Sequence, residues 1–318
     1  MEAITSISND LKSKIISAGQ HIGNTPLVEL KGFHKNPAVQ LFAKKEWLQT
    51  GKSVKGRAAY QIIKDAILKG ELDEERVLID ASSGNTAIAY ASIAKEIGIQ
   101  VEVVLPGNVS KERVRILESL NSKITYSSPF ESTDGAQELV KEIVAKNPDR
   151  YFYADQYNNE NNWKAHYETT GPELWNQTEG KITHFVTGLG STGTFSGTAQ
   201  FLKEQSDSVA TFALQPDFAL HGLEGWKHLE TAIIPGIYKS DLVDQSFRVN
   251  TQNAYDHILP FYLQHGDWIS PSAAANIAGA IHVANQLEEG LVVTMLPDDG
   301  SKYPETISQF TNQINLQS

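Results

Sequence analysis

The stretch ITHFVTGLGSTGTFSGT, residues 182–198, contains an apolar run with β-branched residues, a glycine-rich turn and the beginning of a helix. A strand that passes through a short turn directly into a helix is the repeating unit of an α/β fold with parallel strands. The turn exposes backbone N–H groups at the start of the helix, where an anion such as a phosphate is favoured. The stretch therefore predicts an α/β fold and a phosphate site within it.

Two ligands remain open for this turn. Residues 188–193, GLGSTG, satisfy the GxGxxG spacing of dinucleotide-binding turns, and Asp217 follows the next expected strand. The hydroxyl groups of Ser191, Thr192 and Thr194 instead suit a terminal monophosphate, which has several oxygens that accept hydrogen bonds. A tight βα turn without any ligand is the third possibility for so short a motif.

The alternation of strands and helices continues on both sides of this stretch. Expected strands lie at 40–46, 76–80, 100–106, 123–127, 151–154, 182–188, 209–215, 247–250 and 291–296. Expected helices run from Lys55 to near Gly70 and over 85–97, 110–121, 132–146, 161–177, 194–204, 252–264 and 272–288. This order predicts two α/β domains, each a largely parallel twisted sheet flanked by helices.

The domain boundary is expected at NPDR, residues 147–150, which gives an N-terminal domain of residues 1–150 and a C-terminal domain of residues 151–318. About the first 35 residues could pack on the C-terminal domain instead. Residues 216–240 contain glycine and proline between two expected elements and are predicted to form a long loop over a site.

The composition excludes several classes of protein. The net charge of −11 over 318 residues argues against a nucleic-acid surface, which needs clustered positive charge. The chain has no cysteine, which excludes disulfides and thiolate chemistry, and its nine histidines form no HExxH pattern, so no metal is expected. The first twenty residues contain no apolar signal region, and no apolar run approaches the roughly 20 residues that span a bilayer. We therefore expect a cytoplasmic protein without a membrane partner.

A lysine occupies an unusual position in LQTGKSVKGRAAYQIIKDAILKG, residues 48–70. Apolar residues at helical spacing predict an amphipathic helix here, yet Lys52 and Lys55 lie at its N-terminal end, where negative charge is preferred. This position, beside Arg57, should favour the neutral, nucleophilic amine of Lys55, and such an amine can form a Schiff base with an aldehyde cofactor. The alternative is a solvated basic residue in a loop.

Six stretches, in this order along the chain, resemble the fold-type-II pyridoxal-phosphate enzymes and most closely the cysteine synthases (O-acetylserine sulfhydrylases), especially their B isoform. They are GNTPLVEL (23–30), SVKGRAAY (53–60), SSGNTAIAYA (82–91), GPELWNQT (171–178), GLGSTGT (188–194) and LPDDGSKY (296–303). The block at 156–178 is particularly similar to the B isoform. The resemblance extends from Gly23 to about Thr306 and implies a tryptophan-synthase-β-like fold, pyridoxal 5′-phosphate as cofactor and a homodimer.

The resemblance also assigns residues to the site. Lys55 would be the Schiff-base lysine, and the cradle of the cofactor phosphate would be Gly190, Ser191, Thr192, Gly193 and Thr194. Asn85 would hydrogen bond the ring hydroxyl, and Ser272 would face the pyridine nitrogen. The substrate carboxylate would be held by Ser82, Ser83, Asn85, Thr86 and Gln156. Without the resemblance, SSGNT would be read as a polar turn in which Ser83 or Asn85 caps a helix, and Ser272 equally as the N-cap of the helix that follows it.

The expected reaction is a β-replacement that makes L-cysteine, or S-sulfocysteine, from O-acetyl-L-serine and sulfide or thiosulfate through an aminoacrylate. Lys55 would serve as anchor, base and acid. The alternatives are a cystathionine β-synthase-like activity, a family member that binds cofactor without turnover, and an oxidoreductase that uses GLGSTG for a nicotinamide cofactor.

The chain departs from the family pattern at several positions. The family usually has Asn-Pro ahead of the lysine and Asp after it, whereas this chain has Gln49-Thr50 and Gly56. Ala87 replaces the glycine that follows SGNT, and SPSAAA, residues 270–275, lacks the usual glycines. Glu224-Gly225 stands where the B isoform has two arginines before a tryptophan, and this carboxylate argues against a phosphorylated serine as substrate.

Overall fold

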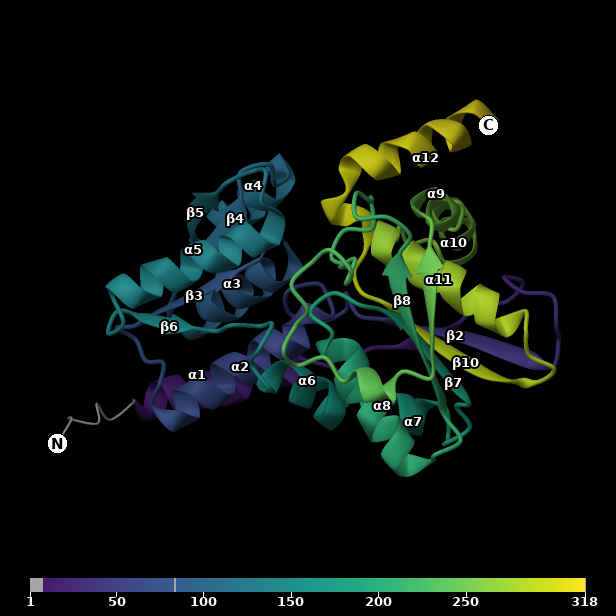
Figure 1. The fold of residues 1–318 in the computed structure, drawn as a ribbon, viewed down its shortest axis with the longest axis horizontal. Helices are drawn as coiled ribbons and strands as arrows, with labels where there is room; N and C mark the ends of the chain where they lie inside the picture. The colour runs from purple at the N-terminus through teal and green to yellow at the C-terminus, as the bar shows by residue number, and fades with distance from the viewer. Residues whose placement is uncertain (1–7, 83, 318) are drawn as a thin grey trace. The chain divides into compact units, whose positions relative to one another are not determined.

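The computed structural model describes residues 8–82 and 84–317. The chain forms two compact units: Met1–Gly23 with Gln49–Ala165, and Asn24–Leu48 with His166–Ser318. Each unit has its own sheet flanked by helices (Figure 1), which confirms the expected α/β fold of two domains. The boundary expected after residue 150 remains a prediction.

The sheet of the first unit is entirely parallel and has the strand order β5-β4-β3-β6. Its strands are β3 (Val77–Ala81), β4 (Gln100–Pro106), β5 (Lys123–Ser127) and β6 (Tyr151–Tyr153). Its helices are α1 (Asn9–Ala18), α2 (Lys55–Lys69), α3 (Asn85–Ile97), α4 (Lys111–Ser119), α5 (Ser132–Lys146) and α6 (Asn161–Ala165).

Both faces of this sheet are covered, because alternate side chains of the central strand β3 enter different clusters. Leu78 packs into the core formed with α1, α2 and α3, whereas Val77 and Ile79 pack with Ala136 and Val140 of α5. All five residues of β3 are buried. Burial on both faces accounts for a strand that reads as continuously apolar except at one position.

The sheet of the second unit has the order β1-β2-β10-β7-β8-β9, in which only the edge strand β1 is antiparallel. Its strands are β1 (Leu27–Glu29), β2 (Val39–Lys45), β7 (His184–Gly188), β8 (Ala210–Pro216), β9 (Gln245–Val249) and β10 (Gly290–Leu296). Its helices are α7 (Gly171–Gln177), α8 (Gly193–Gln205), α9 (Thr251–Tyr255), α10 (Ile258–His265), α11 (Pro271–Ala284) and α12 (Pro304–Gln317). Helix α11 lies against β10 and β7, and its buried alanines belong to the core on this face.

Two of the expected helices are interrupted. The segment 161–177 comprises α6, a π-helical turn at His166–Thr170 and then α7. The segment 252–264 comprises α9 and α10, separated by Asp256 and His257. The first break does have a sign in the sequence, because Gly171 and Pro172 begin α7 directly after the π-helical turn.

Two of the family-like motifs meet in the second unit around a buried lysine. Lys44 Nζ lies 2.8 Å from a carboxylate oxygen of Glu173, and it donates to the carbonyl of Thr25 at 2.8 Å and to Gln177 Oε1 at 2.9 Å. The Asn24 N–H donates to the other carboxylate oxygen of Glu173 at 2.9 Å. GNTPLVEL and GPELWNQT are therefore joined by a buried polar cluster around Lys44.

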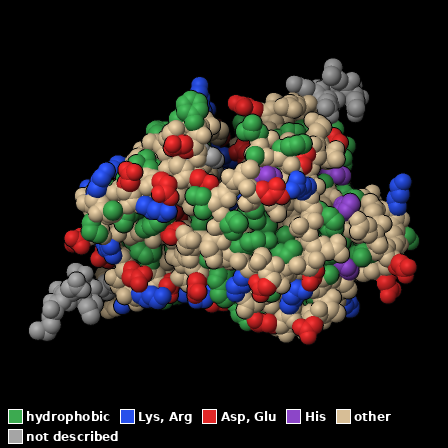
Figure 2. Space-filling view, in the orientation of Figure 1, with side chains coloured by type: hydrophobic (Ala, Val, Ile, Leu, Met, Phe, Trp, Pro, Cys, Tyr) green, Lys and Arg blue, Asp and Glu red, His purple; other side chains and the backbone are tan. Residues whose placement is uncertain are grey.

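The visible surface carries acidic and basic side chains interspersed with one another (Figure 2). No helix in residues 8–82 and 84–317 is both long and apolar enough to cross a membrane.

Candidate active site

Lys55 is the first residue of α2, at the helix end where the sequence predicted it. The first turn of α2 has no acidic residue, and the Lys55 side chain is half-buried. The loop before the helix is ordered by Ser53, whose hydroxyl accepts from the Lys55 N–H at 3.3 Å and whose carbonyl accepts from the Gly56 N–H at 3.0 Å. The lysine side chain is thus presented from a constrained turn at a positive helix end.

The structure gives a reason for the departure at Gly56. A Cβ atom at this position would lie 2.3 Å from the carbonyl oxygen of Thr50. The loop ahead of Lys55 therefore approaches the helix so closely that the family's aspartate would not fit without a backbone shift.

The SSGNT turn lies in the first unit, between β3 and α3. Ser82 is buried, and its Oγ accepts from the N–H groups of Gly84 at 3.3 Å and Ala87 at 3.1 Å. Asn85 is the first residue of α3, and the N-cap is Gly84, which has no side-chain cap. Ser83 lies outside the described residues. Ser82 thus makes side-chain contacts at the start of α3, and Asn85 is the first helical residue.

The structure brings two of the predicted substrate residues together in this unit. Thr86 Oγ1 donates to Gln156 Oε1 at 2.7 Å, and both side chains are buried. Gln156 Nε2 donates to the carbonyl of Ala81 at 2.9 Å. The amide of Gln156 therefore bridges the two ends of the turn that contains Ser82 and Asn85.

The glycine-rich turn in the second unit ends in a left-handed residue. Thr192 has φ +69° and is the N-cap of α8, yet no side-chain cap is made there. Its Oγ1 is buried and has no hydrogen-bond partner among the described residues. Ser191 and Thr194 are also buried. A buried hydroxyl and uncapped helix amides suit an anion with several acceptor oxygens, such as a phosphate.

The loop expected at 216–240 lies directly on this turn. A Cβ atom at Gly188 would lie 1.9 Å from the indole of Trp226, and one at Gly190 would lie 2.2 Å from the carbonyl oxygen of Gly225. The Lys227 N–H donates to the carbonyl of Leu189 at 2.8 Å. The glycines are thus required by the close approach of a second segment.

Ser272 is the second residue of α11 and is buried. The N-cap is Ser270, whose Oγ accepts from Ala273 N–H at 3.1 Å, so the alternative interpretation of Ser272 as the N-cap is wrong. The hydroxyl groups of Ser270 and Ser272 lie 3.2 Å apart. One turn further along α11, Asn276 Oδ1 accepts from Gly188 N–H at 2.7 Å, which connects the helix of Ser272 to the glycine-rich turn.

His166 is a buried residue at this site that the sequence interpretation missed. Its Nε2 lies 3.2 Å from Thr194 Oγ1, and its Nδ1 lies 2.8 Å from Thr170 Oγ1. It occupies the π-helical turn, and such turns are frequent at functional sites. The available signal was its place in the B-like block at 156–178.

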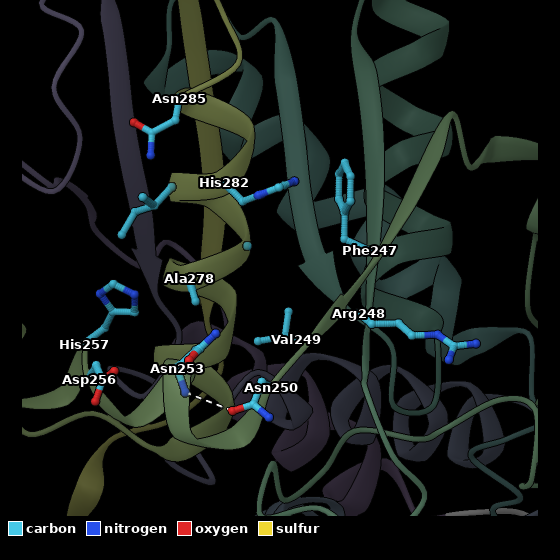
Figure 3. Close-up of a pocket in the computed structure, with 12 residues that line it drawn as sticks. Phe247, Arg248, Val249, Asn250, Asn253, Asp256, His257, Ala278, His282 and Asn285 are labelled. Carbon is cyan, nitrogen blue, oxygen red and sulfur yellow. Dashed lines mark hydrogen bonds between the residues drawn. The ribbon is translucent and has the colours of Figure 1, made fainter.

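A separate pocket of about 530 Å³ opens in the second unit between β9, α9 and α11 (Figure 3). Phe247 and His282 form one wall with ring centroids 4.7 Å apart, and His257 and Asn253 lie on another side. None of the predicted site residues lines it. The predicted chemistry is therefore not located in this pocket.

Comparison with known proteins identifies consistent relatives. Residues 18–298 match the family model described as pyridoxal-phosphate dependent enzyme. A cysteine synthase of Aquifex aeolicus (strain VF5) is 41% identical over 292 residues, which cover 90% of this chain and 89% of the relative. Cysteine synthase B of Escherichia coli (strain K12) is 35% identical over 289 residues, which cover 90% and 94%. The crystal structure of a cysteine synthase from Entamoeba histolytica has a TM-score of 0.83 at 28% identity and covers 94% of this chain and 90% of its own.

Proposed function

Because the chain belongs to the pyridoxal-phosphate dependent enzymes, and within them to the cysteine synthases, we propose that it makes L-cysteine from O-acetyl-L-serine and sulfide. The observation that carries this proposal is the match over residues 18–298, which include both Lys55 and the glycine-rich turn. The oxidoreductase interpretation of GLGSTG is thereby wrong, since the family uses pyridoxal phosphate.

The residues of the glycine-rich turn fit the phosphate of this cofactor. The fit rests on Thr192 Oγ1, which is buried and has no hydrogen-bond partner within residues 8–82 and 84–317, and on the N-terminus of α8, where no side-chain cap is described. Gly190, Ser191, Gly193 and Thr194 would supply the remaining donors. When bound, pyridoxal phosphate supplies an aldehyde for a lysine amine and a ring that withdraws electrons from the substrate Cα.

Lys55 has three tasks in this proposal. Its Nζ would be the amine that holds the cofactor, and it would be free to act as a base while the substrate amine takes its place. The Lys55 amine would remove the Cα proton while acetate leaves from Cβ, and sulfide would then form the new bond at Cβ. Lys55 then returns a proton to Cα, so that one residue at a helix N-terminus acts as anchor, base and acid.

The other assigned residues bind and orient. Ser82, Ser83, Asn85, Thr86 and Gln156 would hold the substrate carboxylate, and Asn85 would also bond the cofactor's ring hydroxyl. Ser272 would face the pyridine nitrogen. A serine hydroxyl stabilises a protonated ring less than a carboxylate does, which favours prompt elimination of acetate.

The test uses the purified holoenzyme. Its absorbance should change when O-acetyl-L-serine is added, and cysteine should form once sulfide follows. Thiosulfate and homocysteine, supplied in parallel, distinguish S-sulfocysteine and cystathionine formation. Cofactor binding without any absorbance change would favour a family member that lacks turnover. A cytoplasmic location and a homodimeric state are also proposed, and light scattering of the holoenzyme tests the second.

A further inference from the structure

Asp80 is a buried carboxylate to which the proposed reaction assigns no role. It is the fourth residue of β3 and is fully inaccessible to solvent. The other four residues of this strand are apolar. An apolar side chain would fill the position without the cost of removing a carboxylate from water, so the explanation for Asp80 lies in its contacts.

The carboxylate of Asp80 accepts three hydrogen bonds from three separate segments. Oδ1 accepts from the Ala81 N–H at 2.8 Å. Oδ2 accepts from the Tyr90 hydroxyl at 3.0 Å and from the Gln156 N–H at 3.2 Å. Tyr90 lies in the middle of α3 and is itself fully buried. Asp80 thus connects the end of β3, helix α3 and the segment after β6.

The contact with Gln156 matters because of what the Gln156 side chain does. Its Oε1 accepts from Thr86 Oγ1, and its Nε2 donates to the carbonyl of Ala81. A primary amide carries two N–H groups, and Ala81 is the acceptor of one of them. The main-chain carbonyl of Gln156 accepts from Asn162 Nδ2 at 2.6 Å. Both the backbone and the side chain of Gln156 are therefore held, and Asp80 holds the backbone amide.

We propose that Asp80 is a positioning residue for the substrate carboxylate: it fixes the backbone of Gln156 so that the second N–H of the side-chain amide points to the substrate. This inference rests on the proposed assignment of Gln156 and Thr86 to the carboxylate site. Asp80 itself touches neither substrate nor cofactor in this scheme. Its loss should therefore weaken binding of the amino-acid substrate without changing the chemistry at Lys55.

Asp80→Asn is the variant that tests this role. It preserves the size of the side chain but replaces one acceptor oxygen by an NH₂ group. That group must face either the Ala81 N–H or the pair formed by the Tyr90 hydroxyl and the Gln156 N–H, and all three are donors. In the holoenzyme, the KM for O-acetyl-L-serine should rise about tenfold, as expected for disturbed buried hydrogen bonds. The KM for sulfide, kcat and the cofactor content should stay within about twofold.

Glu102→Gln is the matched control, because Glu102 is another buried carboxylate in the same unit. It accepts from Lys123 Nζ at 2.9 Å, Thr125 Oγ1 at 2.7 Å and the Tyr151 hydroxyl at 2.9 Å, all on β5 and β6. This variant should lower the midpoint of urea unfolding but leave the KM for O-acetylserine unchanged. An equal rise in KM in both variants would mean that Asp80 acts only through general stability and would overturn the proposal.

Gln156→Ala tests the role of Asp80 separately from the assignment of Gln156 to the substrate carboxylate. A raised KM in Gln156→Ala with an unchanged KM in Asp80→Asn overturns the role of Asp80 alone. An unchanged KM in Gln156→Ala overturns the carboxylate site and the proposal with it. Should Asp80→Asn fail to fold, Tyr90→Phe removes one of the two donors to Oδ2 and must still raise the KM about threefold; no change there refutes the role of Asp80.

Discussion

Replacing Gly190 by alanine tests whether the glycine-rich turn holds the cofactor phosphate. Gly190 does not have a positive φ, so the backbone conformation itself accepts an alanine. The obstacle is steric, because the new Cβ would lie 2.2 Å from the carbonyl oxygen of Gly225. Carbon and oxygen atoms in ordinary contact lie more than about 3 Å apart, so the two segments must separate by roughly 1 Å.

That separation has a cost that can be bounded. Inserting a methyl group into a closely packed site destabilises by about 1–3 kcal/mol. The hydrogen bond from Lys227 N–H to the Leu189 carbonyl, 2.8 Å long, joins the same two segments and would be stretched. A displacement of this size also moves the backbone amides away from a bound phosphate. We expect binding of pyridoxal phosphate to weaken by about 10- to 100-fold, which corresponds to about 1.4–2.8 kcal/mol.

The assay is titration of the apoprotein with pyridoxal phosphate, followed by absorbance, together with urea unfolding of the same sample. Gly107→Ala is the control, since a Cβ there would meet its nearest neighbour, the Ser127 carbonyl oxygen, at an ordinary 3.4 Å. Cofactor affinity in Gly190→Ala within twofold of the parent protein, with an unchanged unfolding midpoint, would refute the reasoning.

Three further predictions follow from the site. Lys55→Ala should abolish turnover and the absorbance of the covalently held cofactor, while the far-ultraviolet circular dichroism stays unchanged; an active variant would remove Lys55 from the mechanism. Gly56→Asp, which restores the family residue, should destabilise the protein by about 1–3 kcal/mol, because its Cβ would lie 2.3 Å from the Thr50 carbonyl oxygen; an equal or higher urea midpoint would contradict this. Burial raises the pKa of Asp80 from 3.8 to about 7, so its contribution to folding is complete below about pH 4 and is lost as the pH rises through 7. Asp80→Asn should remove this dependence, worth about 4 kcal/mol, and unfolding of both proteins at pH 4 and pH 8 measures the difference.

Much of the fold follows from local pattern. Helix α3 has the predicted bounds. The sequence shows its start in the polar turn SSG before Asn85 and its end in Gly98. The strand β1 was not predicted, since three residues at an antiparallel edge carry no periodicity. The break at His166–Thr170 was missed because the segment 161–177 was taken as one helix, although Pro172 in the first turn of α7 is a sign of a new helix start. Local sequence therefore predicts regular elements well and their irregularities poorly.

The residues of the candidate site also differ in how far the sequence alone could indicate them. Lys55 and the turn at 190–194 drew attention through local pattern, a lysine at a helix N-terminus and glycines before a helix, but their predicted roles came from the resemblance to the family. Asp80 and His166 were not found, because a single polar residue within an apolar segment gains meaning only from partners far away in the chain. Asp80 meets Gln156 across 76 residues, and His166 meets Thr194 across 28. No spacing rule predicts such contacts.

The family motifs consequently report on two different properties. SVKGRAAY, SSGNT and GLGSTGT contain residues that can touch cofactor or substrate, whereas GNTPLVEL and GPELWNQT meet each other around the buried Nζ of Lys44. Burying the Lys44 ammonium group without its carboxylate and carbonyl partners would be costly. We therefore expect proteins with this fold to keep both motifs, whichever reaction they catalyse. Similarity in them therefore indicates the fold, while the proposed chemistry would depend on Lys55, Thr192 and Gln156. The departure at Gly56 concerns the fold, because it is explained by the close approach of the Thr50 carbonyl. It leaves Lys55 at its helix end. A change of that kind alters how the lysine is supported without removing the amine on which the proposed reaction depends.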